Sequence, residues 1–189
     1  MRHSRTILPA LMAVVVLSSG CSYNSLQTLD ETINQAQSQI KVQLQRRADL
    51  IGNLVNTVKG VAKQEDTVFI GIAQARAKLS GAISSNDIAA MGQANAAMNA
   101  PLSRLLAIQE AYPTLQSSAN FRALQDELTG TENRIAQART DYNGAVAQFN
   151  TKIRQFPTNI TAKIVHLGTP RPYFNVTDST ANNAPVVKF

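Results

Sequence analysis

Apolar residues recur at steps of four and three along the segment from Lys41 to Glu65. Their positions are Leu44, Ala48, Ile51, Val55, Val58 and Ala62. This spacing predicts an amphipathic helix that buries one face. Because the same stripe already begins at Leu26 and passes through Ile33 and Ile40, we expect one long first helix over residues 26–62.

Three further helices are expected from the rest of the chain. The second follows Glu65 and buries a face before a polar break at Ser84 to Asn86. The expected core positions of this helix are Val68, Ile72, Ala75, Leu79 and Ile83. The third runs from about Asp87 to Tyr112, and Pro101 either kinks it or divides it in two.

The fourth helix is expected to begin with Asn120 as its N-cap and to end before Pro157. A last short helix fits residues 159–167. The predicted fold class is therefore all-α, an antiparallel helical bundle over residues 26–167 with two long helices, the first and the fourth, and two shorter ones. Because the short helices cannot accompany the long ones along their full length, residues 26–40 and 142–156 should form a slimmer, two-helix stalk.

The carboxy-terminal segment, residues 168–189, is predicted to be an irregular tail. It contains Pro170, Pro172 and Pro185 with Asn and Thr residues between them, a composition typical of extended or disordered chain. The residues beyond about Phe174 are expected to be mobile, because their few apolar side chains form no stripe.

The amino terminus resembles a bacterial lipoprotein signal peptide. A short basic start with Arg2 and Arg5 precedes an apolar run over residues 7–17, which is too short to span a bilayer. The sequence Leu-Ser-Ser-Gly-Cys then ends at Cys21, the only cysteine. This is similar to a lipobox, although Ser18 stands where the usual lipobox has Leu. We therefore expect residues 1–20 to be removed, Cys21 to be acylated and residues 21–25 to form an acylated tether.

Two alternatives to lipidation stay open. One is an ordinary cleaved signal peptide, and the other is an uncleaved anchor in which Cys21 has no role. Two or three acyl chains would hold the protein stably on a membrane, whereas one would not. Because Ser22 and not Asp follows the cysteine, the expected location is the outer membrane facing the periplasm in preference to the inner membrane.

The charge of the chain fits a membrane surface better than a nucleic acid. The formal net charge is +6, and removal of Arg2 and Arg5 would leave about +4. A modest positive excess suits anionic lipid head groups. Nucleic-acid binding usually needs a clustered basic face, so no nucleic-acid partner is expected.

A compact charged cluster interrupts the apolar stripe of the first helix at Arg46, Arg47 and Asp49. If the first and fourth helices are antiparallel, their expected ends pair Leu26 with Gln155. This register places the cluster beside Glu132 and Arg134. We predict a structural polar layer there, with Arg47 and Glu132 as its central pair, that fixes helix register more than it stabilises. The alternative is that these side chains face water.

The sequence offers little for catalysis. His166 is the only histidine beyond the signal region, and it is expected to be a surface or helix-end residue. No Cys/His zinc arrangement, Glu-x-x-His pair or phosphate-binding glycine loop is present, so no metal and no cofactor are expected. Glu127 and Glu132 have the residue type of paired catalytic carboxylates, but pairing with nearby arginines is the preferred interpretation. The protein is predicted not to be an enzyme.

Several segments resemble the LemA family of bacterial envelope proteins. The main one is QLQRRADLIGNLVNTVKG at residues 43–60, in which Gly52 replaces the proline of the family pattern. Further similar segments are Glu110–Pro113, Glu127–Asn133 and Phe156–Asn159. The resemblance implies an antiparallel helical bundle fixed to the cell envelope, with no settled biochemical activity. Many relatives look as if they begin with a transmembrane helix, whereas a lipobox-like segment stands here.

Three functional hypotheses follow. The leading one is a membrane-tethered helical scaffold that presents a surface to other, unidentified envelope proteins. The second is a carrier or sensor that binds a lipid or a peptide between its helices, which would need a lined cavity. The third is a hydrolytic enzyme, which would need a polar cleft with displaced pKa values. The oligomeric state does not follow from the sequence.

Overall fold

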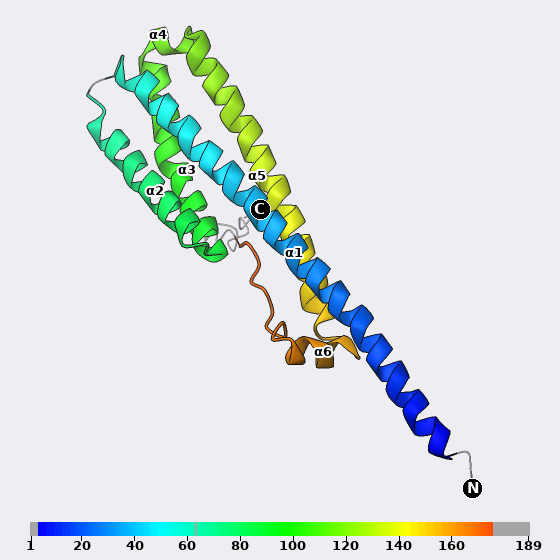
Figure 1. The fold of residues 1–189 in the computed structure, drawn as a ribbon. Helices are drawn as coiled ribbons and strands as arrows, with labels where there is room; N and C mark the ends of the chain where they lie inside the picture. Colours follow the sequence, from blue (N-terminus) through cyan, green and yellow to red (C-terminus); the bar gives the residue numbers. More distant parts are fainter. Residues whose placement is uncertain (1–3, 63, 176–189) are drawn as a thin grey trace, which may run out of the picture. The chain divides into compact units, whose positions relative to one another are not determined.

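The computed structural model of the chain is all-helical in the residues it describes, which are 4–62 and 64–175, with side chains described from Ser22 onward (Figure 1). The helices are α1 (Ser4–Lys59), α2 (Asp66–Ser84), α3 (Ile88–Ala111), α4 (Pro113–Gln116), α5 (Ala119–Lys152) and α6 (Thr158–Ile164). No strand occurs in this part of the chain. The predicted all-α class is confirmed. Helix α5 corresponds to the predicted fourth helix, which is one of the two long helices.

The first helix is longer than predicted. It begins at Ser4, whereas the apolar stripe predicted a start near Leu26. The residues expected to form a short tether, Ser22 to Ser25, are helical. No proline interrupts the chain between Ala10 and Lys59, so the backbone has no strong reason to leave the helix there. The helix ends at Lys59, directly before Gly60, a residue type that favours helix ends.

The ends of the shorter helices follow local capping chemistry. The carboxylate of Asp87 accepts hydrogen bonds from the backbone N–H groups of Ala89 and Ala90 and so caps α3. The helix continues through Pro101 as a single element. At α5 the expected cap, Asn120, lies inside the helix. The Ser118 hydroxyl accepts a bond from the backbone N–H of Phe121 instead.

The chain divides into two compact units, and the two long helices contribute to both. The first unit combines the chain up to Gln37 with Thr140–Pro172. The second unit combines Ser38–Arg139 with the chain from Tyr173 onward.

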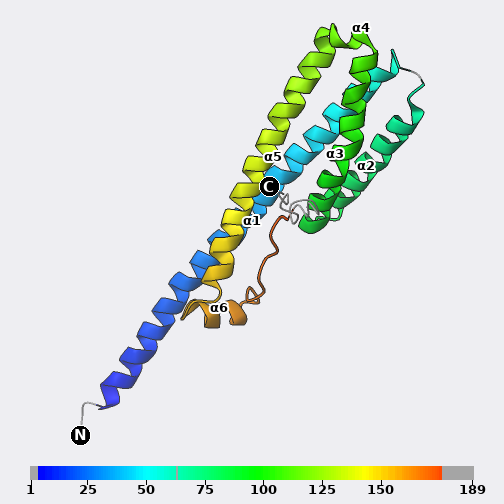
Figure 2. The same cartoon turned by 180° about the vertical axis from the view of Figure 1, so that it is seen from behind.

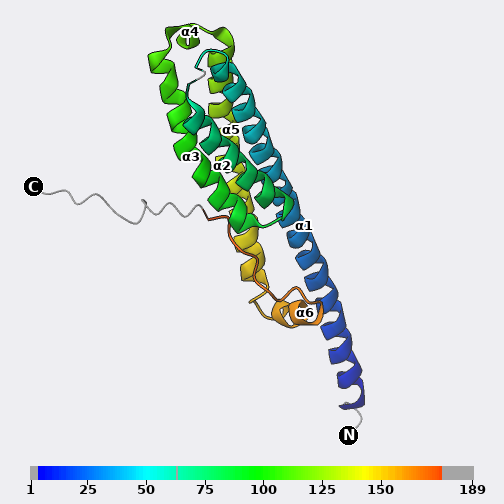
Figure 3. The ribbon, with the colours of Figure 1, turned by 90° about the vertical axis from the view of Figure 1, so that its left-hand side faces the viewer.

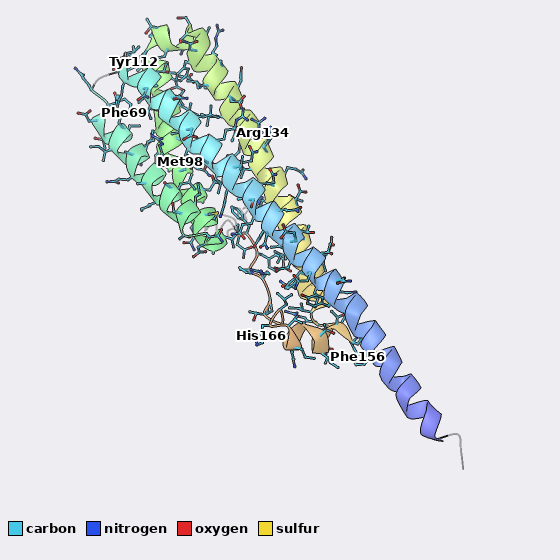
Figure 4. The ribbon with its side chains drawn as sticks, viewed as in Figure 1. Phe69, Met98, Tyr112, Arg134, Phe156 and His166 are labelled. Atoms are coloured by element: carbon cyan, nitrogen blue, oxygen red, sulfur yellow. The ribbon has the colours of Figure 1, made fainter. Side chains whose placement is uncertain are left out.

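The second unit is a four-helix arrangement. Parts of α1 and α5 run beside α2 and α3, as the views in Figures 1 and 2 both show, and the single turn of α4 links α3 to α5. Within this unit the predicted stripe is buried at every position from Ile40 to Ala62, which confirms it, although Ala62 lies beyond the end of α1. Fully buried side chains of this unit include Leu44, Ile51, Leu54, Val58, Ile72, Leu79, Met91, Met98, Leu105 and Phe121. Figure 4 labels Met98 among these helices.

The buried face of α2 differs at both ends from the prediction. Phe69 and Ala82 are buried, whereas Val68 and Ile83 are only half-buried. The larger Phe69 ring covers more apolar surface than Val68 would, and Lys59 Nζ lies 5.1 Å from the centre of that ring. Ile72, Ala75 and Leu79 are buried as predicted.

The first unit contains the remaining parts of α1 and α5 together with α6, and neither α2 nor α3 belongs to it. The absence of α2 and α3 from this unit agrees with the helix lengths, but α6 accompanies the two long helices, so the unit is more than the predicted two-helix stalk. The short helix expected over residues 159–167 is present as α6. Buried side chains of this unit are Leu26, Ile33, Tyr142, Val146, Phe149, Ile153 and Ala162.

The segment after α6 is irregular as predicted, but it is packed and not disordered as far as Asn175 (Figure 3). Asn150 forms two hydrogen bonds with the backbone of Arg171, at 2.8 and 2.9 Å, and the Tyr142 hydroxyl donates to the Pro172 carbonyl at 2.9 Å. Arg171 also pairs with Asp30 at 2.6 Å. Burial raises the pKa of the Tyr142 phenol, and the charge of Arg171 acts against this increase.

Phe174, where mobility was expected to begin, is buried in the second unit. Its side chain is 2% exposed and lies next to Gly92 of α3. An aromatic ring of this size favours burial strongly enough to order irregular backbone. The predictions for the tail beyond this point, including the mobility of residues 176–189, lie outside the described residues.

Gly92 provides a stability test of this packing. A β-carbon at Gly92 would lie 2.6 Å from the backbone oxygen of Asn175, so Gly92→Ala should displace the segment that follows Tyr173. We expect it to lower the free energy of unfolding by about 1–3 kcal/mol, the usual cost of overpacking. Gly81 of α2 is the matched control, because nothing lies within 4 Å of its β-carbon position. Gly81→Ala should stabilise by about 0.5–1 kcal/mol through helix propensity. Urea denaturation of both variants measures the difference, and equal changes would contradict the packing described here.

Candidate functional site

Arg47 of α1 is a buried charge in the second unit. Its residue surface is 4% exposed, although it lies between the apolar positions Leu44 and Ile51. The guanidinium donates to the side-chain oxygens of two asparagines of α3, through Nη1 to Asn95 and through Nη2 to Asn99 at 2.8 Å. These bonds satisfy donors that burial has removed from water.

Glu132 of α5 supplies the counter-charge for Arg47. Its Oε2 lies 2.9 Å from Arg47 Nη1, and half of the Glu132 side-chain surface remains exposed. The structure thus brings together the two residues predicted as the central pair. Burial lowers the pKa of the Arg47 guanidinium, and the Glu132 carboxylate acts in the opposite direction. The result is a polar contact that joins α1, α3 and α5.

The other residues predicted for the layer lie outside this buried contact. Arg46 and Arg134 are exposed and share one oxygen of Glu127, at 2.5 and 2.7 Å. Asp49 takes no part in either cluster, since it is exposed and accepts a hydrogen bond from Gln45 at 3.0 Å. It lies two residues from Arg47 on α1, and residues at that spacing on a helix do not face the same neighbour.

The asparagines, Asn95 and Asn99, were absent from the prediction, whereas the Arg47–Glu132 pair was part of it. The signal was present, because Asn95 lies between Met91 and Met98 on the buried face of α3, where an amide needs a polar partner.

Two grooves border these polar residues in the second unit. A groove of about 490 Å³ lies between α1 and α2 and is lined by Lys41, Val42, Gln45, Arg46, Asp49, Leu50, Asn53 and Ile83. Another, of about 610 Å³, lies between α3 and α5 with Arg47 and Glu132 at its edge, and its apolar lining comes from Leu102, Leu106 and Leu128. The first combines an apolar floor with charges of both signs. The second combines an apolar floor with the buried ion pair.

Gly52, which replaces the proline of the LemA pattern, adjoins an arginine of α2. A β-carbon at Gly52 would lie 2.9–3.0 Å from the guanidinium atoms of Arg76. The missing side chain therefore leaves room for the guanidinium group against α1. Together with Lys59 and Asp49, these residues line a third, polar groove of about 460 Å³.

The candidate residues of the first unit are Cys21 and His166. The backbone of Cys21 lies within α1, and its side chain is outside the described part of the structure. His166 is exposed just after α6 with a φ of 60°, in agreement with the helix-end position expected for it (Figure 4). In the described residues, no set of three His, Cys, Asp or Glu side chains is placed to hold a metal ion. Within the same residues, no helix combines the length and the apolar character needed to cross a membrane.

Each of the two glutamates considered as a catalytic pair contacts arginine. Glu127 contacts Arg46 and Arg134, and Glu132 contacts Arg47. The arginines compensate the charges of both carboxylates. This agrees with the structural pairing that was the preferred interpretation of the sequence.

Comparison with known proteins adds the family. Residues 36–189 match the LemA family. The chain is 31% identical to the magnetosome proteins MamQ 1 and MamQ 2 of Paramagnetospirillum magneticum, in alignments that cover 86% of this chain and 71% of each relative. It is 29% identical to the magnetosome protein MamQ of Magnetospirillum gryphiswaldense, over 87% of this chain and 68% of that protein. Because the family match extends over most of the chain, including Arg47, Asn95 and Glu132, the chain belongs to the LemA family.

Proposed function

We propose that this protein is a membrane-tethered helical scaffold of the bacterial envelope, held by acylated Cys21 and presenting its second unit to other envelope proteins. The favoured location is the outer membrane, facing the periplasm. The tether follows from the lipobox-like segment that ends at Cys21. The MamQ relatives are named as proteins of the magnetosome, which supports an association with a membrane.

The groove between α1 and α2 is the observation that carries the scaffold role. Val42 is 58% exposed at its rim, and Leu50 and Ile83 line it as half-buried apolar side chains. Lys41, Arg46 and Asp49 surround this apolar strip. Apolar surface rimmed by charge is typical of protein interaction sites, where the centre excludes water and the rim selects the partner.

Site-specific photo-crosslinking in cells tests this role. A photoreactive residue at position 42 of the full chain should form a discrete adduct with an envelope protein, identified by mass spectrometry. The matched control is position 80, because Ser80 is an exposed residue of α2 that does not line the groove. Ile83→Ser should lower the yield of the adduct, because it removes an apolar side chain from the lining of the groove. Equal adducts at positions 42 and 80, or an adduct that Ile83→Ser leaves unchanged, would contradict the proposed surface.

The groove between α3 and α5 favours the alternative function, a carrier of a lipid or peptide. It has the volume of a small-ligand site, about 610 Å³, and offers Leu102, Leu106 and Leu128 beside the Arg47–Glu132 pair. An apolar chain with one basic or uncharged polar group would match this lining, because Asp126 and Glu132 stand there against one cation, Arg47, which is already paired. Organic extraction of the purified protein followed by mass spectrometry tests it. Recovery of a lipid or peptide from the wild-type protein, but not from the Leu106→Asp variant, would establish the carrier function. If the wild-type protein yields no lipid or peptide, the carrier function is contradicted.

A further inference from the structure

The exposed face of α6 is unusually apolar for a surface element. Phe156 is 80% exposed, Ile160 is 52% exposed and Ile164 is 72% exposed. Ile160 and Ile164 are four residues apart and therefore share one face of α6. Phe156 precedes the helix by two residues, and the opposite side of α6 is buried through Thr158 and Ala162. Large apolar side chains gathered on an exposed surface mark an interaction site.

The charge around this face is entirely positive within its own stretch of chain. From Tyr142 to Thr177 the sequence contains no Asp or Glu, whereas Lys152, Arg154 and Lys163 lie close to the apolar residues in sequence. The remaining cation of the stretch, Arg171, is paired with Asp30 of α1. An apolar face flanked by lysine and arginine complements a membrane surface that contains anionic lipid.

The predicted anchor lies near the same end of the first unit. Ser25 of α1 and Gln155, the residue before Phe156, line one groove, which also contains Lys152. Cys21 lies one helical turn before Ser25 on α1, or about 6 Å along the helix axis. Tyr23 in that turn is 42% exposed, and tyrosine is a residue type enriched at membrane interfaces. An acyl chain on Cys21 would thus enter the bilayer close to Phe156.

We infer that α6 and Phe156 form a second membrane contact, here called the α6 face, which inserts Phe156, Ile160 and Ile164 among anionic lipid head groups. This inference rests on the membrane tethering proposed above and adds an orientation to it. A single flexible anchor would let the first unit tumble at the surface. Two contacts would hold it with α6 against the lipid.

A fluorescent probe in the full chain tests the α6 face without using Cys21. An environment-sensitive fluorescent amino acid is encoded at position 160, and the purified protein is reconstituted into vesicles of phosphatidylcholine with phosphatidylglycerol. The control probe is at position 80, since Ser80 is exposed in the second unit. We expect brominated lipid to quench the probe at position 160 at least twofold more than the probe at position 80, and aqueous iodide to do the reverse.

The charge requirement is tested on the same probe. Arg154→Glu and Lys163→Glu should each weaken insertion into anionic vesicles by more than about fivefold, because the loss of one basic residue near such a surface contributes about that factor and the added carboxylate is repelled as well. Lys78→Glu on α2 is the matched charge control and should have no effect. The α6 face of the wild-type protein should insert more weakly into vesicles of phosphatidylcholine alone than into vesicles that also contain phosphatidylglycerol.

Two results would contradict the inference that the α6 face contacts the membrane. One is a probe at position 160 that stays as open to iodide as the probe at position 80 while the protein sediments with the vesicles. The other is a probe shielded from both iodide and brominated lipid, which would show that a protein surface covers α6. Sedimentation with vesicles of phosphatidylcholine alone, where the α6 face contributes least, reports the tether, and the probe at position 160 reports the α6 face.

Discussion

Arg47→Ala is expected to lower the free energy of unfolding by about 3 kcal/mol, because it combines a lost buried side chain with unpaired asparagine oxygens. Asn95 is itself buried, and its side-chain oxygen would lose the hydrogen bond that Arg47 donates to it. Glu132→Ala should also be strongly destabilising, by about 3 kcal/mol, because it leaves the buried charge of Arg47 without its counter-charge. Urea denaturation of the single variants measures both values.

The double variant decides whether the two residues act as a pair. Coupled contacts usually deviate from additivity by about 0.5–3 kcal/mol, and we expect a deviation near 1 kcal/mol here. Strictly additive losses would remove the ion pair from the account. Arg47→Met is the matched volume control, because it fills the site without charge. If the pair serves register more than stability, Arg47→Met should be much milder than Arg47→Ala.

Phe174→Ala is expected to be another strongly destabilising change, with a loss of about 3 kcal/mol from the emptied aromatic site. The ring is 2% exposed, whereas the neighbouring Tyr173 is 42% exposed and serves as the control. Tyr173→Ala should change the free energy of unfolding by less than about 0.5 kcal/mol, as is usual for surface positions.

A truncation tests the contribution of the last residues of the chain. Deleting residues 178–189 should leave the melting temperature nearly unchanged, because the few apolar side chains of that segment form no stripe in the sequence. Thermal unfolding followed by circular dichroism measures both the deletion and the substitution. A large loss on deletion, or a small loss for Phe174→Ala, would place the stabilising contacts elsewhere in the tail.

The helical elements were predictable because their signals are local. The apolar stripe from Leu44 to Val58 needs only a period near 3.6 to be read, and Asp87 caps α3 through its own neighbours. The pairing of Arg47 with Glu132 was accessible as well. Once two long helices are taken as antiparallel, their lengths limit the register to within about a turn.

The missed features depend on contacts between distant segments. Asn95 interrupts an apolar face, but its partner on another helix cannot be found from spacing along α3. Phe174 follows Pro170 and Pro172 in a segment whose composition is typical of disorder, and the close approach of the Asn175 backbone to Gly92 cannot be predicted from either segment alone. The exposed face of α6 was overlooked because three apolar residues at helical spacing usually indicate a core.

The central claim, that this LemA-family protein is tethered to a membrane through Cys21, has a direct measurement. Cells expressing the full chain are grown with an alkyne-bearing fatty acid, and the purified protein is examined for label and for mass. The account predicts labelled wild-type protein cleaved before Cys21, and an unlabelled Cys21→Ser protein that keeps residues 1–20 or is mislocalised. Wild-type protein that takes up no fatty acid would contradict the tether.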